Sequence, residues 1–272
     1  MTERLVPAGL HATLVLLRHG ESVAITEGRF QGRLDTPLSP LGERQAELAG
    51  DRLAHPGRPP QIALPAVAPI EIACSPLGRA AATAEAAAAA LRAVHGASGP
   101  RPRPEPALLE IGQGPWEGLE RSEVEARYGA ELEAWRRSPH TSNAPGGELL
   151  VEADRRVRAA LPAVLDRLAR SGGRAPVEAT SASGYPPPTS SPAWSLLVGH
   201  DGVFKVILLA LLELPLDRFW TFSFGLTGIT ILAIHDGHVV VRAHNLLDHL
   251  APLQADSAAL DRAAPREVSG AL

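Results

Sequence analysis

The chain has 272 residues, a formal net charge of −4 and one cysteine, Cys74. This length is enough for one sizeable domain, and we expect a single domain over residues 1–253. The charge excludes a basic field for nucleic acid, and the lone cysteine excludes an intrachain disulfide and a cysteine-based zinc site.

Apolar runs and helical patterns alternate along the chain. Runs typical of strands occur at 13–17, 70–74, 195–198 and 228–234, and helical patterns occur at 40–60, 77–95, 120–137, 148–170 and 202–213. This alternation predicts a layered α/β fold with helices on both faces of a mostly parallel sheet. The alanine-rich run from Ala80 to Ala90 can bury only a thin face, so we expect it to pack closely on the sheet.

Proline and small polar residues interrupt this pattern. Residues 56–69 and 96–106 are rich in proline, which predicts surface loops. Residues 171–192 combine three successive prolines with Ser, Thr, Gly and Ala, so we expect a flexible insertion there. The tail at 254–272 has no periodic apolar face, and we expect it to be disordered.

The sequence also bears on location and partners. The longest apolar run, Val206–Leu212, is far too short to cross a bilayer, and residues 1–11 do not resemble a secretion signal. We therefore expect a cytoplasmic protein with no membrane or nucleic-acid partner. The apolar segment 229–234, interpreted as a sheet edge, suits a homodimer.

Charged and polar side chains follow two predicted strands directly. Arg18 and His19 follow the first apolar run, and His200 follows the run at 195–198. The carboxyl ends of parallel strands are where open α/β sheets place reactive groups. Arg79 at a predicted helix start and Glu110 in a glycine-rich loop add a second cation and a proton donor. Each residue alone also suits a solvated strand or helix end, but together they predict an anion pocket with a nucleophile.

At this point the chain resembles the histidine phosphatase superfamily, from about Leu14 to Leu250. The resemblance implies a three-layer α/β/α sandwich of the phosphoglycerate mutase type. The matching motifs are Arg18-His19-Gly20-Glu21, Gln31-Gly32, Asp35-x-Pro37-Leu38, Ser75-Pro76-Leu77-x-Arg79, Trp116-Glu117-Gly118, Pro145-Gly146-Gly147-Glu148, His200, and Asn245 with His249-Leu250.

The resemblance implies a phosphomonoesterase that uses neither metal nor cofactor and acts on a small phosphorylated metabolite. His19 is implied to attack phosphorus and become phosphohistidine, while Arg18, Arg79 and His200 hold the phosphoryl oxygens. Glu110 is implied to protonate the leaving oxygen, which requires a raised pKa.

Further residues are assigned to the pocket. Ser22, Gln31 and Gly32 are expected to contact the phosphate. A neutral His19 needs a fixed acceptor for its other ring nitrogen, and we predict a nearby backbone carbonyl.

Two positions depart from the family pattern. Ile25 stands where members commonly have an asparagine that touches the phosphate. Asp201 stands where a glycine commonly follows the second histidine. Its carboxylate would repel phosphate, so we expect the Asp201 side chain to turn outward while its amide still serves the phosphate.

Two alternatives remain open, a mutase of the phosphoglycerate type and a non-catalytic binding module. Arg136 resembles one of the paired arginines with which mutases bind a substrate, although it also suits an exposed helix end. The short spacing from Glu110 to Glu148 favours an open phosphatase site, and His140 resembles a position found in phosphatase branches. Gln113 stands where phosphoserine-selective members have a histidine, which weakens that substrate.

Overall fold

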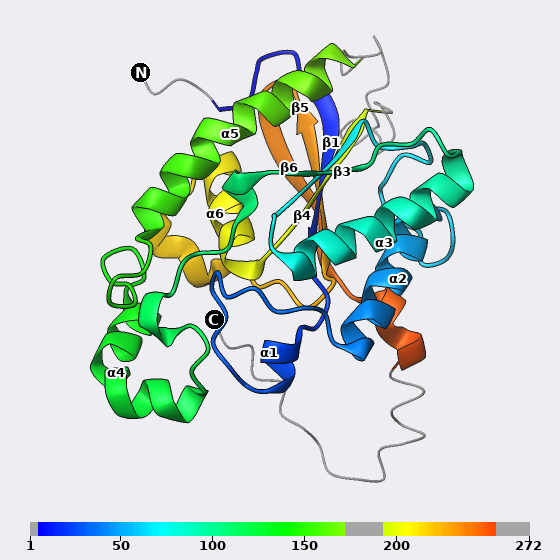
Figure 1. The fold of residues 1–272 in the computed structure, drawn as a ribbon. Helices are drawn as coiled ribbons and strands as arrows, with labels where there is room; N and C mark the ends of the chain where they lie inside the picture. The colour runs from blue at the N-terminus through cyan, green and yellow to red at the C-terminus, as the bar shows by residue number, and fades with distance from the viewer. Residues whose placement is uncertain (1–4, 172–192, 254–272) are drawn as a thin grey trace.

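A six-stranded sheet forms the middle layer, with the strands in the order β3-β2-β4-β1-β5-β6 (Figure 1). This computed structural model describes residues 5–171 and 193–253, so the predicted tail, and all of the predicted insertion except Ser171, lie outside the described residues. The strands are β1 (His11–Arg18), β2 (Glu71–Cys74), β3 (Pro102–Pro104), β4 (Trp194–Gly199), β5 (Ile229–His235) and β6 (His238–Leu246). Parallel pairing joins β3, β2, β4 and β1, and antiparallel pairing adds β5 and β6.

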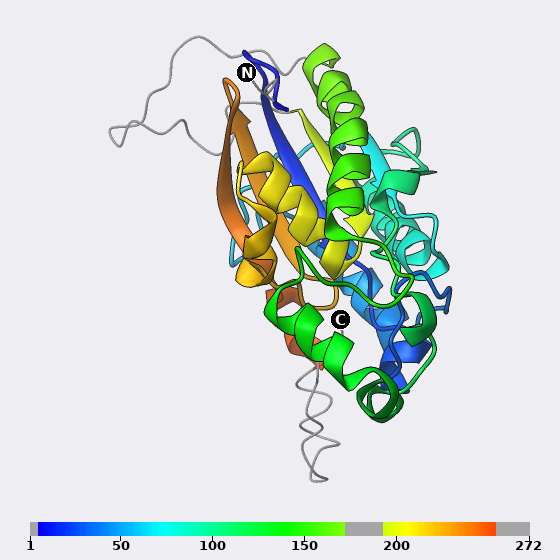
Figure 2. The same ribbon diagram turned by 90° about the vertical axis from the view of Figure 1, so that its left-hand side faces the viewer.

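Helices cover both faces of this sheet, as predicted. The helices α5 (Leu150–Arg170) and α6 (Asp201–Leu211) lie in front of the sheet in Figure 2, and α2 (Pro40–Ala54) and α3 (Gly78–His95) lie behind it. The remaining helical elements are α1 (Val23–Thr26), α4 (Arg121–Arg137), η1 (Pro106–Leu108), η2 (Gly114–Trp116), η3 (Leu216–Thr221) and η4 (Asp248–Leu250). No helix in the described ranges is both long and apolar enough to cross a bilayer.

Strand β1 is apolar from Leu14 to Leu17 because both of its faces are buried there. Leu14 and Leu16 belong to the core under α5 and α6, whereas Val15 and Leu17 belong to the core under α2 and α3. Successive side chains of a strand point to opposite faces, so a central strand carries apolar residues on both faces. This burial fixes the end of β1, where Arg18 and His19 emerge.

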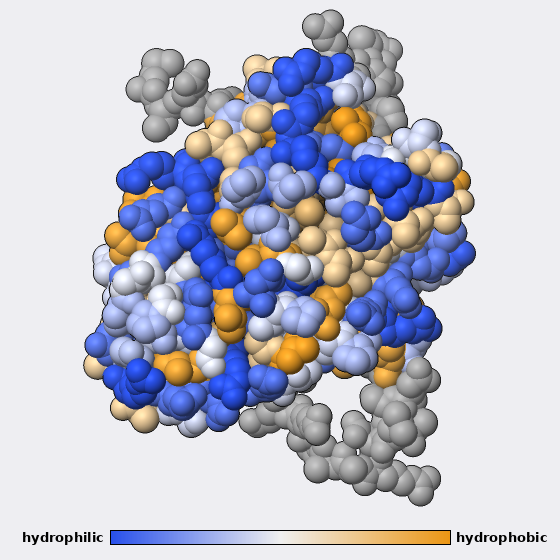
Figure 3. All heavy atoms as spheres, viewed as in Figure 1, coloured by the Kyte–Doolittle hydropathy of each residue, from blue (hydrophilic) through white to orange (hydrophobic). Residues whose placement is uncertain are grey.

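The alanine-rich helix α3 shares a buried core with strands β1, β2 and β4, as predicted, and it also packs closely against α2. A Cβ atom on Gly50 of α2 would lie 3.0 Å from the Cα of Ala87. The outer side of α3 carries exposed alanines such as Ala82 and Ala89, which give the pale apolar band over this helix in Figure 3. Small side chains on both helices therefore permit the short approach.

Both outer strands of the sheet were missed by the sequence analysis. Residues 96–106 were predicted to be a loop, but β3 lies within them, and its prolines are tolerated because an edge strand can leave N–H positions unpaired. Strand β6 was not predicted, since its side chains are only partly buried. It pairs with β5 along its length, so segment 229–234 is interior and the interpretation as a dimer edge is wrong.

Helix α2 is shorter than the predicted 40–60 span. It ends at Ala54, and His55 leaves the helical conformation immediately before Pro56. A residue that precedes proline is disfavoured in the α conformation, which explains the early end.

Candidate active site

His19 lies just beyond the carboxyl end of β1, and both nitrogens of its ring have a partner. The Nδ1 atom lies 2.7 Å from the carbonyl oxygen of Gly20, and the Nε–H of Arg79 points to Nε2 at 3.3 Å. The carbonyl can only accept, so Nδ1 carries the proton and Nε2 presents its lone pair. Burial, followed by the charges of Arg79 and Arg18, lowers the pKa of His19 well below its ordinary value. The predicted backbone acceptor is therefore Gly20, and the ring is neutral near pH 7.

The backbone around His19 is held by close glycine contacts. A Cβ atom on Gly20 would lie 2.4 Å from the carbonyl oxygen of Gly42, so no larger residue fits without movement. The amide of Gly20 donates to Thr83 Oγ1 at 3.1 Å, and the amide of His19 donates to the carbonyl of Gly199 at 2.9 Å. These contacts tie His19 to α3 and to β4.

Arg79 is a buried cation in the first turn of α3. Its Nη1 and Nη2 atoms donate to the carbonyls of Leu34 and Gly32 at 2.8 and 2.9 Å. Burial lowers the pKa of Arg79 to about 10, so the guanidinium still carries its charge near pH 7. Gly32 has a φ of +49°, and a Cβ there would lie 2.3 Å from Oε1 of Glu117, so glycine is needed at this turn.

His200 and Arg18 come from the ends of neighbouring strands. The rings of His200 and His19 have centroids 5.0 Å apart, and Nε2 of His200 lies 2.8 Å from Ser75 Oγ. Burial, followed by the charge of Arg79, lowers the pKa of His200 well below its ordinary value. Arg18 donates from Nη1 to the carbonyl of Phe224. Two arginines and two neutral histidines therefore converge beside the β1 and β4 ends.

The carboxylate of Glu110 sits on the first turn of α6. Its Oε1 accepts from the amides of Ile111 and Val203 at 2.8 and 2.9 Å, and its Oε2 accepts from the amide of Gly202 at 3.0 Å. Burial raises the pKa of Glu110, and the amide hydrogen bonds and Arg79 oppose this rise only in part. The raised pKa that a proton donor requires is thus present.

Ser22 and Gln31 contact each other. Gln31 Nε2 donates to Ser22 Oγ at 2.7 Å, and the same oxygen accepts weakly from the amide of Ile25 at the start of α1. The Gln31 Oε1 atom is buried without a hydrogen-bond partner among residues 5–171 and 193–253. The Ser22–Gln31 pair thus fixes the loop that also carries Gly32.

The expectation that Asp201 turns outward is wrong. The residue is only 5% exposed, and its carboxylate accepts from Lys205 Nζ at 2.7 Å and from the amide of Phe224 at 3.0 Å. Lys205 lies one helical turn later, and Nζ also lies 4.7 Å from the centre of the Trp220 ring. The buried ammonium neutralises Asp201, which removes the need for the carboxylate to reach solvent.

Arg136 and His140 stand apart from these groups. Both are exposed, and Arg136 lies 3.6 Å from Glu125 of its own helix. In the described part of the chain, no hydrogen bond or ion pair links either residue to His19 or Glu110. They remain predictions of substrate contact.

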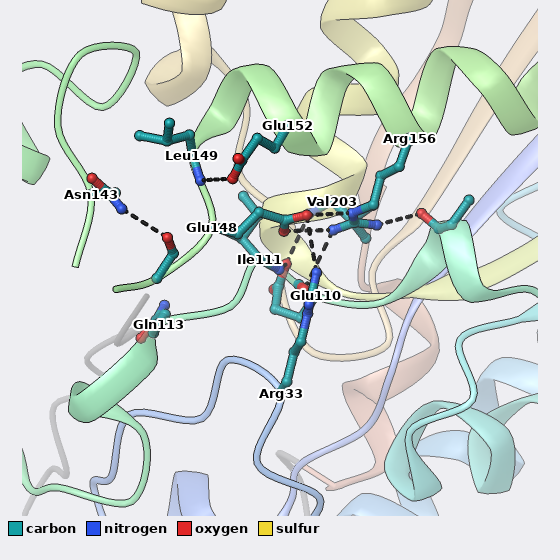
Figure 4. A network of polar contacts seen from close by, with 12 residues as sticks. Arg33, Glu110, Ile111, Gln113, Asn143, Glu148, Leu149, Glu152, Arg156 and Val203 are labelled. Carbon is teal, nitrogen blue, oxygen red and sulfur yellow. Dashed lines mark hydrogen bonds and ion pairs between the residues drawn. The ribbon is translucent and has the colours of Figure 1, made fainter. Parts of the chain in front are cut away.

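Sequence reasoning missed a polar network behind Glu110. Arg33, Glu148 and Arg156 form it, and Figure 4 shows both arginines directed at Glu148 and at the main chain of Glu110. Glu148 ends the Pro145-Gly146-Gly147-Glu148 motif, and Arg156 follows it by eight residues. The contact with Arg33 depends on tertiary structure and has no local signal.

Comparison with known proteins gives the family. The model of the histidine phosphatase superfamily (branch 1) matches residues 14–173 and 188–247. The chain belongs to the histidine phosphatase superfamily. A solved structure of mycobacterial glucosyl-3-phosphoglycerate phosphatase with VO3 superposes on it with a TM-score of 0.68, at 26% identity, and covers 87% of this chain and 100% of that one. The fold is therefore the histidine phosphatase fold.

Two curated members of the superfamily carry phosphatase names. Phosphoserine phosphatase 1 of Hydrogenobacter thermophilus is 26% identical over 242 residues, which are 87% of this chain and 93% of that protein. Glucosyl-3-phosphoglycerate phosphatase of Mycolicibacterium vanbaalenii is 32% identical over 211 residues, which are 76% of each chain. This histidine phosphatase is accordingly a phosphoric monoester hydrolase.

Proposed function

We propose that this histidine phosphatase hydrolyses a small phosphorylated metabolite, without a metal, through a phosphohistidine on His19. One observation carries the proposal. The Nδ1–H of His19 donates to the carbonyl of Gly20, and its Nε2 lone pair faces Arg79, with both residues buried. A neutral imidazole with a fixed tautomer and a cation in front of its free nitrogen suits attack on a phosphate group.

In the first step, Nε2 of His19 bonds to phosphorus while the bond from phosphorus to the ester oxygen breaks. Arg18, Arg79 and His200 bind the non-bridging oxygens, where charge is concentrated in the transition state. The carboxyl proton of Glu110 passes to the departing oxygen, so that a neutral alcohol leaves. The raised pKa of Glu110 supports this role.

In the second step, water attacks the phosphohistidine. Glu110, now a carboxylate, takes a proton from that water as its oxygen bonds to phosphorus. The bond between phosphorus and Nε2 breaks, which releases inorganic phosphate and restores neutral His19.

A mutase is the second candidate. Probable phosphoglycerate mutase GpmB of Yersinia enterocolitica is 31% identical over 204 residues, which are 74% of each chain. The short connection between Glu110 and Glu148 supports the phosphatase, because water must enter an open site. In a mutase, the phosphohistidine would return its phosphate to a bound substrate.

Phosphate release distinguishes these functions. We expect the purified protein to release inorganic phosphate in the presence of EDTA from at least one of p-nitrophenyl phosphate, phosphoserine and 3-phosphoglycerate. His19→Ala should abolish this release, and the matched variant His238→Ala, at an exposed position on β6, should not change it. Transfer of phosphate between hydroxyls of 3-phosphoglycerate with little free phosphate would favour the mutase.

A further inference from the structure

Two arginines from distant parts of the chain hold the main chain of Glu110. Arg33 Nε donates to the carbonyl oxygen of Glu110 at 3.2 Å, and Arg156 Nη2 approaches the same oxygen at 3.4 Å. Arg156 Nη1 also donates to the carbonyl of Ala107 at 2.6 Å. Both arginines therefore hold the main chain of the loop that carries Glu110 (Figure 4).

Glu148 joins the two arginines. Its Oε1 lies 3.0 Å from Arg33 Nη2 and 2.8 Å from Arg156 Nε, and its Oε2 accepts from Arg156 Nη2 at 3.0 Å. Its own amide donates to the carbonyl of Gly112 at 2.8 Å. We call Arg33, Glu148 and Arg156 the carboxylate clamp.

The ion pair between Glu148 and Arg156 is largely buried, unlike an ordinary surface ion pair. The side chain of Glu148 is 10% exposed and that of Arg156 is 19% exposed, whereas that of Arg33 is 41% exposed. A two-pronged contact between an arginine and a carboxylate that is largely removed from water resists rearrangement better than an exposed single contact. Loss of Glu148 would leave two guanidinium groups without their shared partner.

The two ends of Glu110 thus depend on different elements. Its carboxylate rests on the amides of Gly202 and Val203 in α6, whereas its carbonyl depends on the clamp. A general acid must keep hydrogen-bonding geometry with the departing oxygen, and an error of about 1 Å can cost roughly 100-fold in rate. Movement of the loop relative to α6 would turn the carboxyl group away from that oxygen.

We propose that Glu148, held between Arg33 and Arg156, is a positioning residue that aims Glu110 at the leaving oxygen. This inference rests on the proposed function, in which Glu110 is the proton donor. It predicts that loss of the clamp reduces the rate most for a substrate whose leaving group needs a proton from Glu110.

A comparison of two leaving groups tests the inference. Phenyl phosphate needs more acid assistance than p-nitrophenyl phosphate, and kcat/KM reports the steps up to departure of the alcohol. For Glu148→Gln we expect kcat/KM to fall about tenfold further on phenyl phosphate than on p-nitrophenyl phosphate. Equal losses on both substrates, or no loss, would overturn the inference.

The matched control is Glu152→Gln. Glu152 is the next acidic residue, lies in the first turn of α5 and accepts only from the amide of Leu149 among its described contacts. Its removal should change both kcat/KM values within about twofold, as for an exposed position. A selective loss in Glu152→Gln as large as in Glu148→Gln would contradict a specific role of the clamp.

Two more variants keep the test decisive. Arg33 is the most exposed residue of the clamp, so Arg33→Gln keeps the test possible if Glu148→Gln does not fold. Its kcat/KM should also fall further on phenyl phosphate than on p-nitrophenyl phosphate, by a smaller factor than in Glu148→Gln. In Glu110→Gln the selective loss should be largest, and addition of Glu148→Gln should not increase it, because both act through one group. If Glu110→Gln loses kcat/KM equally on both substrates, the proposed proton donor is wrong. If Glu110→Gln shows the larger loss on phenyl phosphate and the clamp variants do not, only the role of the clamp is overturned.

Discussion

At the scale of single residues, burial shifts the pKa values of the two groups proposed to react, His19 and Glu110, in opposite directions. Burial lowers the pKa of His19 because it disfavours the imidazolium, and burial raises the pKa of Glu110 because it disfavours the carboxylate. Burial thus shifts both pKa values in the direction that the proposed nucleophile and the proposed acid require.

These opposite shifts predict a bell-shaped pH profile for kcat/KM. Because the pKa of His19 is lowered, its neutral form persists below the ordinary value of 6.5, and activity falls only when His19 is protonated at still lower pH. Because the pKa of Glu110 is raised, the acid persists above the ordinary value of 4.5, and activity falls as pH rises through the raised pKa. On phenyl phosphate, Glu110→Gln should remove the alkaline fall and keep the acidic one. An unchanged alkaline fall would assign that limb to another group.

Gly202 offers a second prediction at this scale. A Cβ there would lie 2.6 Å from Glu110 Oε1, so Gly202→Ala should displace the carboxylate and reduce kcat/KM by about 10- to 100-fold. The melting temperature should change little, since alanine favours a helix. Gly129→Ala in α4 is the matched control, because its Cβ would meet nothing within 4 Å. Full activity in Gly202→Ala would contradict the described position of the Glu110 carboxylate against the first turn of α6.

At the scale of elements, the start of α6 binds the Glu110 carboxylate through two amides and also provides Asp201, which forms a buried ion pair with Lys205. The amide of Phe224 donates to Asp201, and the carbonyl of Phe224 accepts from Arg18. Asp201 and Lys205 therefore help to place the loop that Arg18 touches. The side chains of Asp201 and Lys205 are 7% and 4% exposed, so the charges depend on each other.

Removal of one partner should cost more stability than removal of both. Lys205→Met leaves Asp201 buried without its cation, and we expect a loss of about 3 to 5 kcal/mol in the free energy of unfolding. The double variant Asp201→Asn with Lys205→Met should recover much of this loss. Urea unfolding of the single and double variants measures the difference, and strictly additive losses would show that the pair is not coupled.

At the scale of the whole molecule, the predicted alternation of strands and helices was confirmed because the central strands are buried on both faces. Strands β1 and β4 contain uninterrupted apolar runs, Leu14–Leu17 and Leu196–Val198, and runs of that kind stand out in a sequence. The edge strands β3 and β6 were missed because edges tolerate proline and partial exposure. Local pattern therefore predicts the centre of this sheet better than its borders.

The residues of the candidate site also differ in how far the local sequence predicts their placement. The placement of Arg18, His19 and His200 could be predicted because Arg18 and His19 follow the apolar run of β1 and His200 directly follows β4. The acceptor of His19 needed only the next residue, Gly20. The clamp could not be predicted, because Arg33 meets Glu148 across 115 positions of sequence and only the folded chain joins them.

Trapping the phosphohistidine tests the central claim most directly. Rapid acid-free denaturation of the protein during turnover of a ³²P-labelled substrate should leave acid-labile, alkali-stable label on a peptide that contains His19. His19→Ala should carry no label, and Glu110→Gln should still carry it when the leaving group is p-nitrophenol. Turnover with no label on His19, or label that persists in His19→Ala, would contradict the account.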